Sequence, residues 1–407
     1  MKQLGSNAAI LTAIAGVLII ASMVADRFGA SSATVVVLVL MLAVLSVAFA
    51  ALSTATMKVS AFSAAGHRQP LVHATLLMAC IAGGLVVLGG HPTPVASLPL
   101  LLAVASGLLI ATSVAGVIRR SGATSLAEIM QSRFRSRAVT LITALLTMVP
   151  LGLLAAFAGD AATVLLAEAM HLSRWQTTLF SAVMVGLMLL PGGALGLVSV
   201  ALIFGAMSAV AWGVPLVSAV AMPESTVVQV WSRTAAQFLD TGGNIGLTLG
   251  YAFGASGLFV LLAGAATAAG ARTAAGAHII AAMLVVCAGA AAIMVQNTVV
   301  VTTERLQGAS PAALPPALYS ERARGLVTIC GIVPIHPAEA QKACDRLAAT
   351  TGKPAPMLAV SPRRDGLWPA LVLELPLVMG VVHGLAMPLL ALFAFAAVVR
   401  ALAQTLV

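Results

Sequence analysis

The chain has 407 residues, of which 60% are hydrophobic and only 8% are charged, and its mean hydropathy is +1.07. Soluble domains carry roughly 25% charged residues, so this composition excludes an ordinary soluble domain and predicts an all-α membrane protein. The formal net charge of +9 is compatible with nucleic-acid binding. The Lys and Arg residues, however, fall in short loops beside apolar stretches, as the positive-inside rule describes for membrane proteins. We therefore expect no nucleic-acid partner.

Apolar stretches recur along the chain, each close to the roughly 20 residues that a helix needs to cross a bilayer. We expect about ten transmembrane helices on this basis. The first stretch resembles a signal peptide, and we interpret it as a retained helix. The last predicts either two short helices, broken near Gly380–Gly384 or at Pro388, or one helix that follows a surface segment. The stretches centre on residues 8–25, 33–56, 71–90, 96–118, 138–158, 175–191, 194–221, 243–268, 274–296 and 368–405.

A strongly basic stretch separates two apolar runs at residues 119–137, and we call it the arginine hinge. It carries five arginines and one glutamate. Charge at this density is unfavourable inside hydrocarbon, so the hinge is expected at a membrane surface. Its candidate site residues are Arg119, Arg120, Glu128, Arg133 and Arg137.

The basic residues also predict which loops share a side of the membrane. Short loops rich in Lys and Arg stay in the cytoplasm. This rule places the hinge, Lys58, Arg68 and Arg272 inside, together with the N-terminus. Residues 91–95 and 159–171 contain no Lys or Arg and are expected outside. The expected location is a bacterial-type inner (plasma) membrane.

By the same alternation, the polar segment of residues 297–366 lies outside. Its proline-rich start predicts a linker. An apolar run over 326–333, followed by an amphipathic stretch over 337–350, predicts a small cap with a short strand and a helix. Cys330 and Cys344 both fall in this cap, where an oxidising compartment permits a disulfide. The alternative is two buried thiols.

Several segments, in order along the chain, resemble motifs of the sodium/solute symporter family. Ala-Gly-His-Arg at residues 65–68 resembles the Tyr-x-x-Ala-Gly-Arg pattern before the family's first core helix, and residues 122–137 resemble its intracellular segment. Pro-Gly-Gly-Ala at residues 191–194 resembles the turn that opens the fifth core helix. Residues 249–258 are similar to the sixth core helix of the acetate-permease-like branch. The resemblance covers about residues 58–295.

The resemblance implies a transporter-type bundle built from two inverted repeats. Solute and ion would then bind at mid-membrane beside broken first and sixth core helices. The chain would comprise two accessory helices (1–57), a symporter-like core (58–296), the external cap (297–366) and a C-terminal helix or helix pair (367–407).

Candidate pathway residues come from two sources. One is the place of a residue in the first or sixth core helix, although a tight helix crossing explains the glycines equally well. The other is an ionisable side chain within the last apolar stretch, which indicates a proton relay or a contact with a partner subunit. The alternative is that the side chain lies at the membrane–water interface or bonds a carbonyl at a helix break. The candidates are Thr75, Gly83, Gly84, Gly254, Ser256, Glu374 and His383.

Several polar positions of the family are apolar in this chain. Ala201 and Phe204 stand at usually polar positions of the fifth core helix, and Phe259 and Val260 replace a Pro-His pair. No Ser/Thr-rich eighth core helix follows Asn297, so we expect an incomplete second repeat. A bound sodium ion requires several oxygen ligands. A sodium ion is a possible ligand of this chain, but the side chains that the family uses to bind it are missing. No other metal and no cofactor are expected.

Two functions are compatible with these features. The resemblance implies secondary transport of a small organic acid or similar solute. The replaced polar positions favour the alternative, a non-transporting accessory subunit that uses the fold as a scaffold within a larger membrane complex. The expected partners are the lipid bilayer and either a small solute or neighbouring subunits. We expect no enzyme activity, because no nucleophile–histidine pair or phosphate loop is present.

Overall fold

The computed structural model describes most of the chain, and the described elements are mainly long helices. The described residues are 32–89, 94–170, 172–220, 228–233, 259–306, 309–319, 327–351, 358–360 and 377–406, with single helical residues at 17, 20, 21, 24 and 236. In chain order the elements are α2 (Ser32–Ser53), α3 (Val59–Ala64), η1 (Ala65–His67), α4 (Leu71–Gly89), α5 (Pro94–Ser121), α6 (Leu126–Phe134), α7 (Arg137–Met170), α8 (Arg174–Leu189), α9 (Ala194–Val220), α12 (Phe259–Thr267), α13 (Ala271–Leu306), η3 (Pro311–Ala313), η4 (Pro316–Tyr319), β1 (Val327–Ile329), α14 (Pro337–Thr351), β2 (Leu358–Val360) and α16 (Leu377–Leu406).

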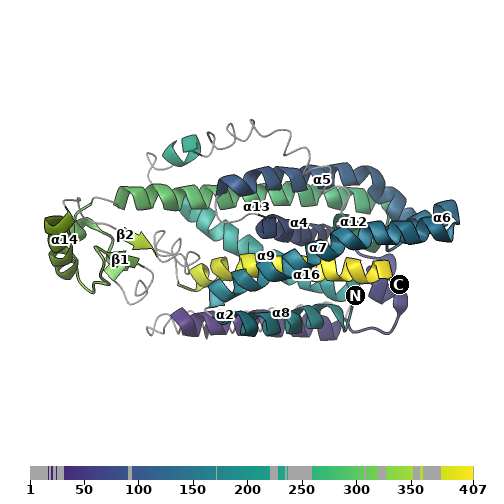
Figure 1. Ribbon diagram of the computed structural model, residues 1–407, viewed down its shortest axis with the longest axis horizontal. Coiled ribbons are helices and arrows are strands. Elements are labelled where there is room, and N and C mark those ends of the chain that lie inside the picture. The colour runs from purple at the N-terminus through teal and green to yellow at the C-terminus, as the bar shows by residue number, and fades with distance from the viewer. Residues whose placement is uncertain are drawn as a thin grey trace.

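The long helices run along the longest axis of the molecule, with the small cap of β1, β2 and α14 at one end and α6 at the other (Figure 1). In the described ranges, seven helices are long and apolar enough to cross a membrane. The predicted class, a multi-pass membrane protein built from helices, is confirmed. The first predicted span and much of the eighth lie largely outside the described residues.

Helix ends differ from the predictions at two places. α7 continues to Met170, so it extends beyond the predicted span of residues 138–158 and through most of the segment 159–171 that was expected outside. Ala and Leu are frequent in that segment, and both are strong helix formers. The prediction considered only that Lys and Arg are missing there and did not use this helix propensity. α13 continues to Leu306, into the segment predicted to be extramembrane. In the last apolar stretch, α16 is one helix with Pro388 inside it, as in the single-helix alternative.

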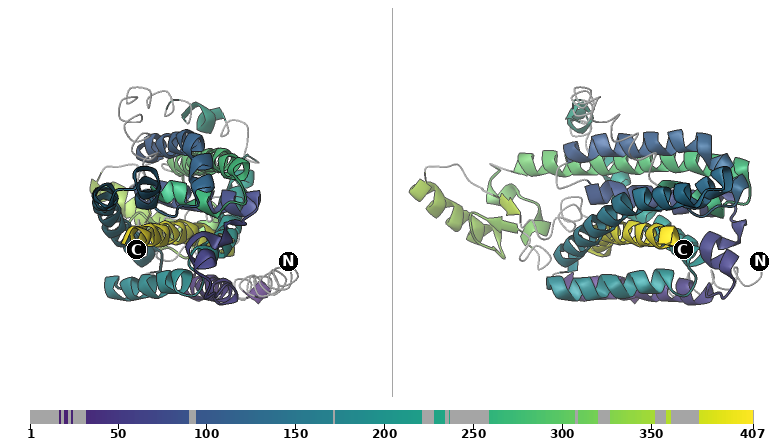
Figure 2. Two further views of the ribbon diagram at one scale, coloured as in Figure 1. Left: turned by 90° about the vertical axis from the view of Figure 1, so that its right-hand side faces the viewer. Right: turned by 45° about the vertical axis from the view of Figure 1, so that its right-hand side comes forward.

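α16 is the central helix of the bundle. Its membrane-spanning window is 78% buried inside the molecule, whereas that of α7 is only 11% buried. α16 packs against α7, α4, α9 and α2, and the end-on view in Figure 2 places it between the α2–α8 pair and the remaining helices. Phe393 of α16 meets Phe204 of α9 edge to face, with ring centroids 5.8 Å apart. α7 is therefore the least buried of the candidate spans in the described ranges.

The crossing of α4 and α16 depends on Gly84. A Cβ atom at this position would lie 2.6 Å from Ala394 Cβ and closer still to Leu390 O, so only glycine allows this approach of the two helices. α4 is continuous from Leu71 to Gly89, whereas the resemblance implies a broken first core helix. Gly84 thus serves a tight crossing, and the expected break is absent over these residues.

The cap is a two-stranded antiparallel sheet with one helix. β1 pairs with β2 in the register Val327–Val360, Thr328–Ala359 and Ile329–Leu358. A disulfide joins Cys330, which follows β1, to Cys344 of α14. The described part of the cap therefore contains two short strands where one was predicted, one helix, and a Cys330–Cys344 bridge.

Reducing this disulfide should loosen the cap and leave the bundle intact. The bridge closes a loop with a sequence separation of 14, and a crosslink of that span stabilises by about 3 kcal/mol. With reductant, hydrogen exchange should accelerate at residues 327–351 and stay unchanged in α4 and α16. Unchanged exchange across the cap after reduction would show that the bridge is dispensable for its fold.

Candidate functional site

A tight loop over residues 63–69 leads into α4, and we call it the pre-α4 loop. Ala65, Gly66 and His67 have φ angles of 50°, 69° and 55°, in the left-handed region that residues other than glycine rarely adopt. Such a run persists only where surrounding contacts hold it in place. Side chains of distant elements hold this loop.

Arg119, the first residue of the arginine hinge, is one of them. Its Nη2 atom donates to His67 O at 3.1 Å and to Ala269 O at 3.3 Å, and its Nε donates to Ala268 O. His67 Nδ1 lies 2.6 Å from Ala266 O, across the same junction. One guanidinium group thus joins the pre-α4 loop, the end of α5 and the turn between α12 and α13. These loops are predicted to share a side of the membrane, and the structure brings them to one end of the bundle.

Arg400 holds the other side of the loop, and the sequence reasoning missed it. Its guanidinium donates to Ser63 O, and Gln404 Nε2 donates to the same oxygen at 2.9 Å. Arg400 is only 9% exposed. An arginine in the last turns of an apolar helix ordinarily indicates an interfacial charge near a helix C-terminus, so its sequence context did not reveal a buried contact.

The other hinge residues have local or exposed positions. Glu128 forms a capping box with Ser125 at the start of α6: Glu128 N donates to Ser125 Oγ at 3.2 Å, and Ser125 N donates to the Glu128 carboxylate at 3.3 Å. Arg120, Arg133 and Arg137 are exposed at the same end of the bundle. Only Arg119 of the candidate arginines ties separate elements together.

α4 and α9 run antiparallel and close together above this loop. Cys80 Sγ lies 3.5 Å from Ala201 O. One turn along, a Cβ atom at Gly205 would lie 3.0 Å from Leu76 Cδ2. Cys80 is thus opposite Ala201, and Leu76 is opposite Gly205. One further helical turn along both helices places His73, near the start of α4, at the level of Ser208.

Three polar side chains of these two helices carry buried, unpaired atoms, and we call them the α4–α9 polar cluster, although Thr75, two residues from His73, projects from a different side of α4. His73 Nδ1 and Thr75 Oγ1 on α4, and Ser208 Oγ on α9, are buried and have no hydrogen-bond partner among the described residues. A buried polar atom left unpaired destabilises a protein by about 1–3 kcal/mol, so such atoms usually have a water, ion or ligand as partner. Among the predicted pathway residues that the structure describes, Thr75 is the one with a buried and unpaired side-chain oxygen.

The remaining pathway candidates do not form one site in the described structure. A Cβ atom at Gly83 would meet nothing within 4 Å, so Gly83 faces away from the packed core that surrounds Gly84. Gly254, Ser256 and Glu374 lie outside the described residues, as does the side chain of His383, whose backbone belongs to α16.

Apolar side chains fill the centre of the bundle. Ala201, Phe204 and Val260, three of the positions where the chain departs from the family, are 0%, 1% and 0% exposed. A Cβ atom at Gly264 of α12 would lie 2.7 Å from Met78 Sδ on α4. The predicted loss of polar groups at these positions therefore produces a packed hydrophobic core.

An exposed ion pair lies apart from this region. Arg233 Nη1 and Nη2 donate to Glu304 Oε2 and Oε1 at 2.9 and 3.0 Å. The hydrogen bond from Arg233 lowers the pKa of Glu304, and the bond to Glu304 raises the pKa of Arg233. Both side chains are partly exposed to solvent. A substitution of Arg233 therefore controls for the loss of an ion pair at a site that is not proposed to bind a ligand.

These features define a multi-pass membrane protein built as a bundle of helices. No protein-family model and no curated protein matches the sequence. Among solved structures, the chain is similar to a Na+-coupled sialic acid symporter in a substrate-bound outward-open state, with a TM-score of 0.57 and 12% identity over 91% of this chain and 72% of that chain. At this identity the likeness shows the fold alone. It agrees with the transporter-type fold that the sequence resemblance implies.

Proposed function

We propose that the chain is a secondary transporter that moves a small solute, such as a short organic acid, across a bacterial-type inner membrane. The shared fold supports this function, and the α4–α9 polar cluster is the observation that carries it within this chain. Its three unpaired polar atoms belong to α4 and α9, two helices that pack against each other in this bundle. A solute or ion that passes between α4 and α9 would supply the missing partners. The acetate-permease-like resemblance supports a small carboxylate as the solute.

Uptake by purified protein tests this proposal. The chain is reconstituted into vesicles, and labelled acetate or pyruvate is offered with an imposed sodium or proton gradient. We expect gradient-dependent accumulation that empty vesicles do not show. Absence of uptake for both solutes under both gradients would contradict the proposed transport of small organic acids.

Replacing Thr75 by valine should lower uptake and leave stability unchanged or slightly higher. Valine matches the shape of threonine and removes a hydroxyl that has no protein partner. Loss of one hydrogen bond to a charged solute should reduce uptake roughly tenfold. The matched control is Thr298→Val, because the Thr298 hydroxyl already donates to Met294 O at 2.8 Å. Equal uptake by wild type and Thr75→Val would remove the α4–α9 polar cluster from the pathway.

The apolar centre favours a second candidate, a scaffold subunit of a larger membrane complex. Transport by rocking motions requires helices that separate, whereas Gly84 packs α4 directly onto the α16 backbone. This candidate predicts that the chain co-purifies in fixed stoichiometry with other membrane proteins and that reconstituted vesicles take up no solute. Isolation of the chain alone, with active uptake, would exclude it.

A further inference from the structure

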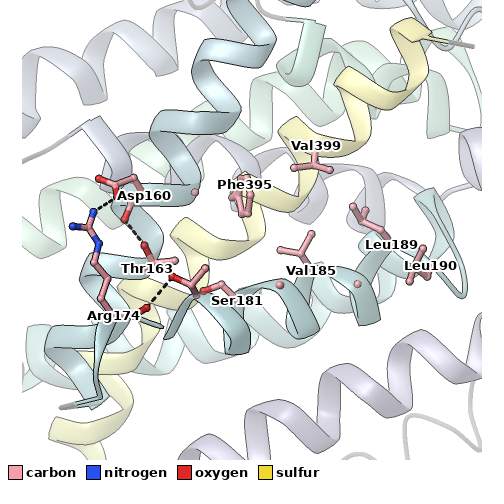
Figure 3. A pocket seen from close by; sticks show the side chains of 13 residues that line it. Asp160, Thr163, Arg174, Ser181, Val185, Leu189, Leu190, Phe395 and Val399 are labelled. Carbon is pink, nitrogen blue, oxygen red and sulfur yellow. Dashed lines mark hydrogen bonds and ion pairs between the residues drawn. The ribbon is translucent and has the colours of Figure 1, made fainter. Parts of the chain in front are cut away.

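A groove of about 630 Å³ opens between α7, α8 and α16, away from the α4–α9 polar cluster. Its two ends differ in character (Figure 3). Asp160 of α7 and Arg174 of α8 form an ion pair at one end. The walls beyond them are mainly apolar, with Phe395 of α16 and Leu190 after α8 among the lining residues.

The polar end of the groove lies at the height of a membrane surface. Asp160 is 23 residues beyond Arg137, where α7 begins in the arginine hinge, which corresponds to roughly 35 Å along a helix. The hydrocarbon core is about 30 Å thick. If the hinge is at one surface, the Asp160–Arg174 pair is therefore at the headgroup level of the opposite leaflet.

The groove is long enough for an acyl chain. From Arg174 to Leu190, both of which line it, 16 residues of helical backbone span roughly 24 Å. One leaflet contributes about half of the 30 Å of hydrocarbon. The apolar wall thus extends through the full depth of the leaflet that contains the ion pair.

Ser181 supplies an unpaired donor within the groove. It lines the groove about two turns beyond Arg174 and is only 2% exposed, and its Oγ is buried without a partner among the described residues. A hydroxyl in this position requires an acceptor. The ester carbonyls of a glycerophospholipid lie just below its headgroup, between the charges and the acyl chains.

The charges at the polar end select the type of headgroup. The side chains of Arg174 and Asp160 are 69% and 62% exposed, so each retains room for a second partner. Arg174 also begins α8, whose N-terminus favours a phosphate. A headgroup with a phosphate and an ammonium group complements both charges, whereas a purely anionic headgroup would meet the Asp160 carboxylate without compensation.

We propose that the α7–α8–α16 groove binds one zwitterionic glycerophospholipid of the phosphatidylethanolamine type. The phosphate contacts Arg174, the ammonium contacts Asp160, the Ser181 hydroxyl donates to an ester carbonyl, and one acyl chain lies along Val185, Leu190 and Phe395. This site is separate from the proposed transport pathway and stands whether or not the chain transports a solute.

Native mass spectrometry of the full chain, released from nanodiscs that contain equal amounts of phosphatidylethanolamine and phosphatidylglycerol, tests the proposal. Wild type should retain one phosphatidylethanolamine per chain after detergent exchange. The double variant Asp160→Asn/Arg174→Gln should reduce its occupancy at least roughly tenfold. Arg233→Gln, which breaks the exposed ion pair with Glu304, is the control and should retain the lipid as wild type does.

A second variant keeps the test informative if the charge changes impair folding. Ala182 is exposed in the groove wall, so Ala182→Phe should fill the space for the acyl chain and displace the lipid without altering the polar end. Equal retention by wild type and both variants would overturn the proposal, and so would retention of phosphatidylglycerol in equal amounts. A melting temperature that rises with added phosphatidylethanolamine in wild type but not in Ala182→Phe would support it independently.

Discussion

Gly84→Ala should destabilise the bundle markedly, whereas Gly83→Ala should be neutral or slightly stabilising. The two glycines are neighbours on α4 but meet different surroundings. At Gly84 an added methyl group would overlap Leu390 O and Ala394 Cβ of α16, and at Gly83 it would meet nothing within 4 Å. Overpacking of this kind destabilises by about 1–3 kcal/mol. At Gly83 the change removes backbone freedom from the unfolded chain and can add about 0.5–1 kcal/mol.

Thermal unfolding of both variants in the same detergent measures this difference. We expect a clearly lower melting temperature for Gly84→Ala than for wild type, and an equal or higher one for Gly83→Ala. Both variants replace glycine by alanine at adjacent positions of the same helix. A difference between them therefore reports the contact with α16 and not the loss of a glycine as such. Equal melting temperatures for the two variants would mean that α4 and α16 do not cross at Gly84.

Arg119→Ala should have the largest effect among single substitutions in the arginine hinge. Arg119 donates to the carbonyls of His67, Ala268 and Ala269, and hydrogen bonds to a charged group contribute about 1.5–3 kcal/mol each. Because the three bonds share one guanidinium group, we expect a combined loss of roughly 3 kcal/mol or more. Lysine should restore little of this loss, since an ammonium group lacks the planar donor fork.

Arg120→Ala is the matched control, because the neighbouring side chain is exposed and should change stability by no more than about 0.5 kcal/mol. Hydrogen exchange should localise the effect: Arg119→Ala should accelerate exchange at residues 65–69 and 268–270, where the left-handed loop loses its support. If Arg119→Ala and Arg120→Ala behave alike, the pre-α4 loop is held by other contacts.

The sequence predicted features that depend on local composition. Apolar windows predicted the multi-pass helical class, and seven candidate spans are found among the described residues. The basic hinge and the turn before Arg272, which were predicted to share a side of the membrane, meet at one end of the bundle. Ser125 and Glu128 have capping-box spacing, which local geometry satisfies directly. The strand and helix of the cap likewise follow from a short apolar run before an amphipathic stretch.

Features that depend on distant partners were not predictable in this way. Arg400 contacts Ser63 across 337 positions of sequence, and no local pattern indicates that pairing. At Gly84 the sequence left a helix break and a tight helix crossing open, and only the approach of α16 decides for the crossing. The groove beside α8 arises where three helices meet, and Ser181 becomes notable only when burial leaves its hydroxyl unpaired.

Labelling from one side of the membrane tests the central claim most directly, namely that this is a membrane-spanning transporter-type bundle with the arginine hinge and the disulfide-linked cap on opposite faces. Single cysteines are introduced at Ser132 in α6 and at Gln341 in α14, both exposed, in a chain whose free cysteines Cys80 and Cys287 are replaced by serine. A membrane-impermeant maleimide added to intact cells should label position 341 and should reach position 132 only after the membrane is opened. Labelling of both positions from the same side would contradict the account.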